Sequence, residues 1–528
     1  MRPTLRSLPS FAPIVGASLV LRLVIAGTTG FGVDEAYAVT VSRPFSLSYF
    51  DHPPLHFWIA GAAAQLAHDT SPFWIRLPFV LLFTVTLVAI GNLTERLFSV
   101  RAAVFAVASL ALSGVLGVTT GTWVLPDGPL VAATSVTAWL LAPLLVPSAP
   151  ASGHEAVHVV SARIEWRWIL IGVGTALAVL SKYHAVLTAG GVVFYFATVP
   201  ASRWWLRTPW PWIAAAIGAI GMVPIIWWNA GHDWASFAFQ GARASASHWS
   251  IAPVAENLAG QAAWLLPWIG IPLAIALVRA LRAGPSHHAQ WFCVCLAAGP
   301  IVMFTAIALG GARGLPHWQA PGWLFVFPLL GAWVDDVLRR GITWPRRWLA
   351  WSAIATMTLV CALLLHVRVR AFDHLLSASA RRADPSLDAV SWRPVVEAAI
   401  AAAERERVSG DGEPLVLAAR SWIQAGQIGA SLGRHAIPVV CLCRDPHHFA
   451  WQNDTLPTRW TRVVLLDRLQ PERRGWRDAE QVLGSDSVQI SARDTVTITA
   501  DLRVARYVIR RAPPRRAPGR MTEPAGEN

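Results

Sequence analysis

Charged residues are scarce in this chain of 528 residues: Asp, Glu, Lys and Arg make up 14%, whereas 54% of the residues are hydrophobic. So low a charged fraction excludes an ordinary water-soluble domain and a disordered chain. The formal net charge is +13, but no basic face with interleaved aromatic residues stands out, which argues against nucleic-acid binding. The composition therefore predicts a polytopic α-helical membrane protein whose excess arginines lie in cytoplasmic loops.

Cysteine and lysine are also rare. The 5 cysteines lack the spacing of a metal site. Cys441 and Cys443 lie two residues apart on an expected strand, which seldom gives disulfide geometry, so we expect buried thiols. Lys182 is the single lysine of the sequence. Lys182 lies at the outward end of an apolar run, where a compact ammonium group could bind a phosphate. The alternative is that a lysine occurs there by chance and has no function.

Long apolar runs are abundant, in contrast. A membrane-spanning helix needs roughly 20 apolar residues. Runs of this kind begin near Phe11, Phe73, Ala102, Pro129, Trp168, Ala185, Trp210, Leu258, Trp291, Pro321 and Trp348. We therefore expect about eleven transmembrane helices, an odd number that puts the two termini on opposite sides of the membrane.

Basic and acidic residues occupy alternate loops between these runs. One set holds the arginines and is cytoplasmic by the positive-inside rule. The opposite set holds Asp34, Asp51, Asp127, Asp233 and His317. The acidic residues are therefore expected on the outer face of a bacterial cytoplasmic (inner) membrane.

The apolar runs stop near residue 370, which divides the chain. We expect a transmembrane domain at 1–370 with outward interfacial helices at 32–70, an extracytoplasmic soluble α/β domain at 371–509, and a disordered Arg- and Pro-rich tail at 510–528. In the second domain, strands at 415–419 and 438–443 bracket a helix at 423–432. A strand from Arg462 and short alternating runs at 488–490 and 496–498 follow.

The segment 32–58 contains more candidate catalytic and binding residues than any other. Asp34 and Glu35 follow the first apolar run directly, and Tyr37, Tyr49, Asp51 and His52 precede the rigid pair Pro53-Pro54. The prolines fix the backbone at a point where Asp51 and His52 would face the same cavity as Asp34. The alternative is a polar loop whose acids occur there by chance.

Arg22 is a guanidinium within the first apolar run. An arginine inside a membrane is functional or paired by default. It could pair with Asp127, hold a lipid phosphate, or snorkel to the surface. Asp127 itself lies between a proline and a glycine, where Asp is also a common turn residue.

The other outward loops supply the remaining candidates for substrate binding. These are Tyr183 and His184 beside Lys182, then Asn229, His232 and Arg243, then Arg313 and His317. Aromatic residues interleave with the polar ones at 227–243, which suits a wall between a prenyl chain and a phosphate or sugar. An interfacial amphipathic helix is the simpler interpretation, and both can hold.

These motifs resemble those of membrane glycosyltransferases of the GT-C type that use polyprenyl-phosphate sugars. That group includes the protein O-mannosyltransferases and the lipid A aminoarabinose transferases, glycosyltransferase families 39 and 83. The matching segments are DEAY at 34–37, YFDHPP at 49–54, LSKY at 180–183 and WWNAGHDWASFAFQ at 227–240. His52 departs from the aminoarabinose transferases, which tend to have lysine at that position.

The resemblance implies transfer of a sugar from a polyprenyl phosphate to an envelope lipid, glycan or protein, with inversion. Such a reaction needs a carboxylate near the developing oxocarbenium ion and cations near the leaving phosphate. We assign Asp34 as general base or electrostatic partner of the incoming nucleophile, and Glu35 as the residue that orients the acceptor. Lys182, Arg243 and Arg22 are assigned to the leaving phosphate.

A divalent cation is the one cofactor that the sequence leaves open, with Asp51, His52 and His232 as candidate ligands. Asp51, His52 and Asp127 would otherwise shape the cavity.

Two other classes compete with the transferase. A transporter or flippase of lipid-linked intermediates should show paired internal repeats, and no clear duplication is seen. A membrane scaffold would not need Asp34, Asp51 and Lys182 on one side.

Overall fold

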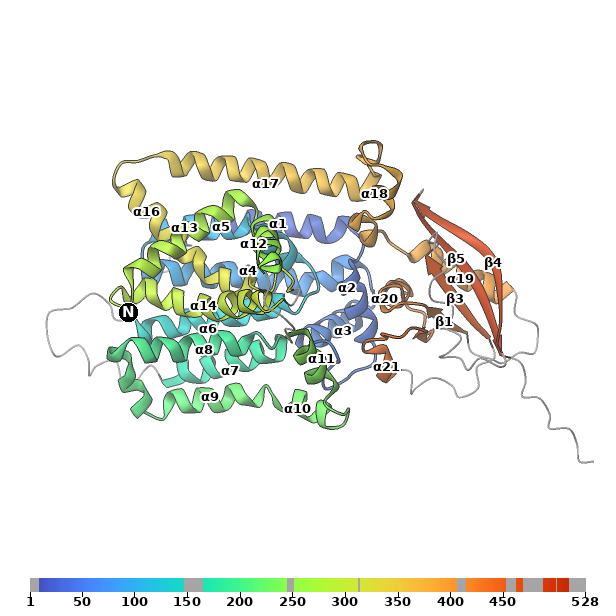
Figure 1. The fold of residues 1–528 in the computed structure, drawn as a ribbon, viewed down its shortest axis with the longest axis horizontal. Coiled ribbons are helices and arrows are strands. Elements are labelled where there is room, and N and C mark those ends of the chain that lie inside the picture. The colour runs from blue at the N-terminus through green and yellow to red at the C-terminus, as the bar shows by residue number, and fades with distance from the viewer. Residues whose placement is uncertain are drawn as a thin grey trace, which may run out of the picture. The chain divides into compact units, whose positions relative to one another are not determined.

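Figure 1 shows a bundle of long helices and, later in the chain, a small sheet. The computed structural model describes residues 9–146, 165–244, 251–311, 314–405, 415–452, 462–468, 488–499 and 501–511. The chain divides into two compact units, Met1–Phe372 and Asp373–Asn528.

The first unit contains only helices and loops in its described residues. The first half of the bundle consists of α1 (Ala12–Thr28), α2 (Val33–Val41), α3 (Leu55–Ala67), α4 (Pro72–Leu97), α5 (Val100–Ala111), the π-helix η1 (Gly114–Thr120), α6 (Asp127–Leu145), α7 (Glu165–Ser181), α8 (Ala185–Thr198) and the 3₁₀ helix η3 (Pro200–Arg207). The second half consists of α9 (Trp210–Ile220), α10 (Val223–Ala230), α11 (Ala235–Ala244), α12 (Ala252–Leu265), α13 (Pro267–Ala283), α14 (His288–Leu309), α15 (Ala320–Trp323), η4 (Leu324–Val326), α16 (Phe327–Arg339) and α17 (Trp344–Val369).

Many of these helices have the length and composition of membrane spans. In the described residues six qualify alone: Pro72–Leu97, Asp127–Leu145, Trp210–Ala230, His288–Leu309, Ala320–Arg339 and Trp344–Val369. Four more pairs qualify only together and are bent by more than 40°, which gives up to 10 spans. The multi-pass membrane fold is confirmed, whereas the expected number of eleven is not. The apolar helix α7, which is shorter than a qualifying span, accounts for the difference.

The first bent pair creates the loop that carries the candidate site. The axes of α1 and α2 differ by 78°, so the chain turns sideways where the apolar run ends. Asp34 and Glu35 lie in the first turn of α2, where acidic side chains interact favourably with the helix dipole. Helix α3 begins directly after Pro53-Pro54, and α4 begins at Pro72, a residue suited to a first helical turn. Prolines therefore lie at the starts of both α3 and α4.

Close helix packing holds the bundle together around α7. A Cβ atom at Gly174 would lie 2.3 Å from Thr137 Oγ1 on α6, and one at Gly172 would lie 2.8 Å from Ile217 on α9. Glycine at both positions lets α7 approach its two neighbours closely, as small residues do in membrane helix pairs.

The second unit is an α/β domain. Its elements are η5 (Asp373–Leu375), α18 (Ala378–Arg382), η6 (Pro385–Ala389), α19 (Arg393–Arg405), β1 (Val416–Ala419), α20 (Trp422–Ser431), β2 (Val439–Cys441), α21 (Phe449–Gln452), β3 (Arg462–Arg468), β4 (Val488–Thr499) and β5 (Leu502–Arg511). The strand order is β2-β1-β3-β5-β4. β1 is parallel to β2 and β3, and β5 is antiparallel to β3 and β4. The predicted strand, helix and strand around α20 are confirmed.

Three expectations for this unit need correction. The two short runs at 488–490 and 496–498 belong to one strand, β4, with register irregularities at Ala492/Asp494 and Thr497/Thr499. Residues 510 and 511, expected in the disordered tail, end β5, and residues 512–528 lie outside the described residues. Cys441 and Cys443 form a disulfide with Cα atoms 5.5 Å apart. The thiol prediction assumed one continuous strand, but β2 ends at Cys441.

Candidate active site

A buried ion pair between Glu35 and Arg76 lies at the base of the candidate site. The Arg76 guanidinium donates to both carboxylate oxygens of Glu35, at 2.8 Å from Nε and 2.6 Å from Nη2. Both side chains are only 1% exposed. The Glu35 carboxylate also accepts from the backbone N–H groups of Gly32, at 2.9 Å, and Val124, at 3.0 Å. Every oxygen of Glu35 is thus already bonded within the protein.

Arg76 uses its remaining donors on the end of α1. It donates to the backbone carbonyls of Ala26, Thr29 and Gly30 at 2.7–3.2 Å, and to the Thr29 hydroxyl at 2.9 Å. One guanidinium therefore joins α4 to the carbonyls that the bend after α1 leaves without helical partners. These contacts provide partners for the guanidinium of Arg76, a charged group that would be very costly to bury without them.

Asp34 differs from its neighbour. It is exposed at the start of α2, whereas Glu35 is 1% exposed. The structure separates the acidic pair into a carboxylate that faces outward and one that holds the loop. Asp34 is therefore the carboxylate of the pair that a substrate can reach.

Asp51, the next acidic residue of the loop after Glu35, accepts hydrogen bonds at both its side chain and its backbone. The Tyr37 hydroxyl donates to the Asp51 carboxylate, and the Gln240 amide donates to the Asp51 backbone carbonyl at 2.5 Å. The rings of Phe50 and Phe239 lie 4.6 Å apart. Helix α11 therefore packs onto the loop at 49–52, and two segments that the sequence singled out separately come together.

Tyr49 and two histidines continue this cluster toward α3. Tyr49 is 1% exposed, and burial raises its pKa to about 12, against an opposing backbone hydrogen bond at Ser46. The His52 and His56 rings lie 5.8 Å apart. Burial and, to a smaller extent, the Lys182 charge together lower the pKa of His56 to about 3, against a backbone hydrogen bond at Pro53 that raises it. His56 is therefore neutral near pH 7 and lies within the electrostatic reach of Lys182.

Asp127 and Lys182 form a second buried ion pair. The Lys182 ammonium lies 2.8 and 2.9 Å from the two carboxylate oxygens of Asp127, which begins α6. Their side chains are 3% and 9% exposed. The pair joins the start of α6 to the end of α7. Asp127 is thus more than a turn residue, and Lys182 is engaged by a carboxylate in this structure.

The two residues after Lys182 point to different neighbours. The Tyr183 hydroxyl lies 2.8 Å from that of Ser236 on α11, and burial raises the pKa of Tyr183. The His184 ring stacks on Phe304 of α14, with ring centroids 4.4 Å apart. Tyr183 thus connects this loop to α11, while His184 packs against the bundle.

Asn229 and His232 maintain the turn between α10 and α11. The fully buried Asn229 donates to the Ile225 carbonyl at 2.9 Å and accepts from the backbone N–H groups of Ser236 and Phe237. His232 Nδ1 lies 2.7 Å from the Trp228 carbonyl, and the two rings stack at 4.1 Å. These contacts hold the backbone of the segment that reaches Asp51.

Arg22 is buried in the bundle, with 2% of its surface exposed. It donates to the Ser18 carbonyl at 2.8 Å, and its guanidinium lies 4.4 Å from the centre of the Phe83 ring. Pairing with Asp127 is wrong, because Lys182 takes that carboxylate. Snorkelling is wrong as well, because the head does not reach the surface. Arg22 Nε has no hydrogen-bond partner in the described residues.

The remaining candidates are less well placed. His317 lies in the turn before α15, with its ring 6.1 Å from that of Trp264. The Arg243 side chain and all of Arg313 lie outside the described residues. Among the residues that are described, Asp51, His52 and His232 do not gather into a group of ligand atoms within 4.8 Å of one another. The structure thus does not assemble the candidate cation site.

Sequence reasoning missed three residues of this site. Arg76 carries the same signal as Arg22, a guanidinium within an apolar run, and could have been found by it. His56 follows the prolines by two residues and resembles a packing residue. Gln240 gives no signal without knowledge of which loop α11 covers.

A family model and a relative of known activity each match part of this chain. A family model described as dolichyl-phosphate-mannose-protein mannosyltransferase matches residues 51–228. Lipid A galacturonosyltransferase RgtD from Rhizobium johnstonii is 22% identical over 311 residues, which cover 58% of this chain and 61% of that protein. The match thus spans less than two thirds of the relative.

Solved structures extend the likeness to nearly the whole chain. The crystal structure of ArnT from Cupriavidus metallidurans in the apo state has a TM-score of 0.61 at 16% identity, and covers 94% of this chain and 97% of that one. The chain has the GT-C glycosyltransferase fold. ArnT bound to undecaprenyl phosphate has a TM-score of 0.57 at 14% identity, and covers 95% of this chain and 98% of that one. The family resemblance and the GT-C fold class predicted from the sequence are confirmed.

Substituting Glu35→Gln should destabilise the protein, because Arg76 would keep its burial and lose its counterion. Breaking a buried ion pair in this way costs about 3–5 kcal/mol. We expect a lower melting temperature and less monodisperse protein in detergent. Glu95→Gln, at an exposed position of α4, is the matched control. Equal melting temperatures for the two variants would contradict the role assigned to the ion pair.

Proposed function

We propose that this protein is an integral-membrane glycosyltransferase. It moves a sugar from a polyprenyl-phosphate donor to a lipid, glycan or protein acceptor of the cell envelope, with inversion at the anomeric carbon. The observation that carries the proposal is the exposed Asp34, held beside the saturated Glu35–Arg76 pair in a chain with the GT-C fold. The donor class is supported by the likeness to a structure of ArnT bound to undecaprenyl phosphate. Lipid A is the acceptor class named for RgtD.

In this mechanism Asp34 accepts the proton of the acceptor hydroxyl as its oxygen attacks the anomeric carbon. The C–O bond to the phosphate breaks in the same step, and the polyprenyl phosphate leaves with the bonding electrons. A single displacement needs no covalent enzyme intermediate. Glu35 acts differently from its sequence assignment: with all its oxygens bonded, it positions α2 and thereby Asp34, and does not contact the acceptor. Positioning of this kind lowers the barrier by fixing the geometry of attack.

Lys182 serves the leaving phosphate through its charge. A phosphate that approaches the Asp127–Lys182 pair competes with the carboxylate for the ammonium group, and its negative charge is stabilised strongly in a poorly hydrated site. The neutral His56, whose ring lies 5.8 Å from that of His52, offers a hydrogen-bonding group without adding charge. Tyr37, Tyr49, Asp51 and Tyr183 line the outward loops around these groups, and Arg22 adds a buried positive charge deeper in the bundle.

The active site is proposed to face the outside of the bacterial inner membrane, with the second unit on the same side. The arginine-rich loops support this orientation. The Cys441–Cys443 disulfide supports it independently, because disulfides persist in oxidising compartments.

Asp34→Asn should abolish transfer while the protein remains folded, because Asp34 is exposed and asparagine has nearly the same size. Loss of a general base lowers the rate by about 10²–10⁴-fold. The measurement is movement of radiolabel from polyprenyl-phosphate sugars to acceptors in a membrane extract by purified protein. Asp233→Asn, an exposed acid at the turn before α11, is the control. Normal turnover by the Asp34 variant would reject the assignment, and label that only crosses the membrane would favour a flippase.

The Asp127–Lys182 pair can be tested for a role beyond stability. Lys182→Met alone should unfold or destabilise the protein by about 3–5 kcal/mol, because Asp127 stays buried without a partner. The double variant Asp127→Leu with Lys182→Met should recover the melting temperature, since both charges are gone. Transfer should remain at least tenfold low in the double variant if Lys182 acts on the phosphate. Full recovery of transfer would reduce the pair to a structural one.

The orientation is open to a direct test with reporter fusions. Alkaline phosphatase, which is active only outside the cytoplasm, should be active when fused after residue 372. A fusion within the cytoplasmic loop at 284–287 should be inactive. The reverse pattern would place the site on the wrong side for an envelope acceptor.

A further inference from the structure

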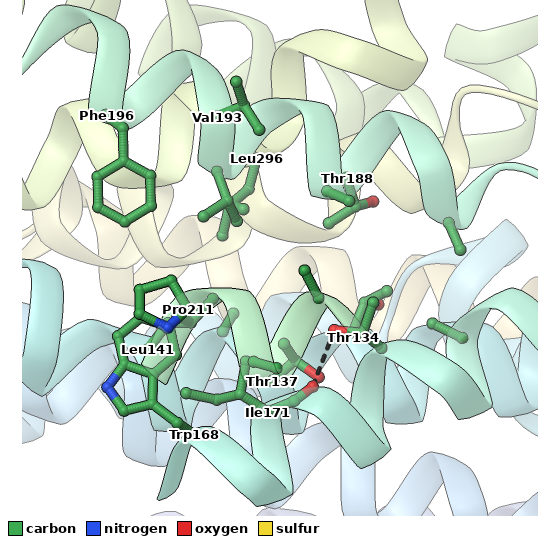
Figure 2. Close-up of a pocket in the computed structure, with 18 of the residues that line it drawn as sticks. Thr134, Thr137, Leu141, Trp168, Ile171, Thr188, Val193, Phe196, Pro211 and Leu296 are labelled. Carbon is green, nitrogen blue, oxygen red and sulfur yellow. Dashed lines mark hydrogen bonds between the residues drawn. The ribbon is translucent and has the colours of Figure 1, made fainter. Parts of the chain in front are cut away.

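A second candidate site lies within the bundle, away from the outward loops. An open apolar cavity of about 490 Å³ is lined by residues of α6, α7, α8, η3 and α9 and by Leu296 of α14 (Figure 2). Its size falls within the range of roughly 300–1,000 Å³ of small-molecule sites. Figure 2 shows Phe196, Val193 and Leu296 on one side of the cavity and Leu141, Ile171 and Trp168 on the other. The proposed transferase reaction does not use any of these residues.

The cavity exists because small side chains face each other across it. Its walls carry the alanines Ala138, Ala178, Ala185 and Ala189. Threonine hydroxyls on α6 and α7 do not make it polar, since Thr134, Thr137 and Thr175 each donate to a carbonyl of their own helix at 2.8 Å. An unfilled apolar space of this size would forfeit many van der Waals contacts. A hydrocarbon chain from the bilayer is the material that fits such a wall.

The cavity is long enough for such a chain. It follows one face of α8 from Ala185 to Ala197, which spans about 18 Å at the rise of an α-helix. That is more than half of the roughly 30 Å hydrocarbon core of a membrane. An extended chain that lies along α8 therefore begins near one membrane surface and ends past the middle of the bilayer.

The end of the cavity at η3 is basic and exposed. The axes of α8 and η3 differ by 110°, as expected where a chain leaves a span and runs along the membrane surface. Arg203 of η3 lines the cavity. Its guanidinium donates to the carbonyls of Phe196, at 2.9 Å, and Ala197, at 2.5 Å. These bonds fix its position at the end of α8, and no carboxylate in the described ranges forms an ion pair with it.

We propose that this cavity binds one acyl chain of an anionic phospholipid from the leaflet at η3, with the lipid phosphate at Arg203. A basic residue between transmembrane helices at the membrane surface is the feature that recognises anionic head groups. Trp204 and Trp212, exposed beside Arg203, are residue types that concentrate at head-group depth. The partner is thus a structural lipid, distinct from donor and acceptor.

The opposite end of the cavity fits a lipid head group less well. Ala178 and Ala185 flank Lys182 there, but Lys182 is 3% exposed and paired with Asp127. A lipid that entered from that side would meet no exposed cation beside the cavity among the described residues. The tail of the polyprenyl donor is therefore the alternative occupant, and the test must separate the two.

The test measures phospholipid retained by the full-length protein after purification in a mild detergent. Native mass spectrometry and quantitative lipid extraction should find about one phosphatidylglycerol or cardiolipin per protein in the wild type. Arg203→Gln should lower this amount at least tenfold, whereas Arg207→Gln, on the same helix but outside the cavity, should leave it unchanged. Val193→Trp, at the exposed rim of the cavity, should lower retention as Arg203→Gln does, because it fills the space.

A thermal measurement keeps the proposal testable if a variant folds poorly. Added phosphatidylglycerol should raise the melting temperature of the wild type and of Arg207→Gln more than phosphatidylcholine does, and this difference should vanish in Arg203→Gln. Equal effects of the two arginine variants would mean general surface attraction and would overturn the site. Retention of polyprenyl phosphate that Val193→Trp abolishes would assign the cavity to the donor tail instead. Neither readout depends on transfer activity.

Discussion

The Glu35–Arg76 ion pair is the interaction on which the arrangement of the outward loops depends. A carboxylate and a guanidinium that are each 1% exposed can be buried only if nearly every donor and acceptor finds a partner. Those partners come from the end of α1, the start of α2, α4 and the segment before α6. The pair therefore fixes four parts of the chain relative to one another. Asp34, which precedes Glu35 on α2, remains exposed.

The second ion pair applies the same constraint to the later helices. Asp127 and Lys182 join the start of α6 to the end of α7, and the Lys182 charge reaches His56 on α3. Helix α11 is held to the first loop by Gln240 and Phe239. The two buried ion pairs thus hold the segments that carry the candidate site residues. A carboxylate, a neutral histidine and buried cations in one region suit a reaction that separates positive and negative charge.

Several features of this arrangement could be read from residue order alone. The apolar runs predicted the spans, since a helix that crosses a membrane must be long and hydrophobic. Pro53 and Pro54 were expected to fix the backbone, and α3 begins directly after them. The motifs at 34–37 and 49–54 located the loop, because each motif is recognised from a few residues that are close together in the sequence. The strands around α20 followed from periodicity in the same way. Failures occurred where a prediction needed contacts between distant segments: Asp127 was one of the partners considered for Arg22, whereas Lys182 pairs with it, and β4 was divided in two.

The sequence by itself determined that this chain is a membrane protein with the GT-C fold and a separate α/β unit, and which loops hold the candidate site residues. Those properties are local, because hydrophobic length, proline position and motif spacing depend on neighbours in the chain. Only the tertiary structure decided which acid is buried and which is exposed, which cation each carboxylate holds, and where an apolar cavity remains. Those outcomes depend on partners 41 to 55 residues away, and burial removes water as the alternative partner, so that one pairing is strongly preferred.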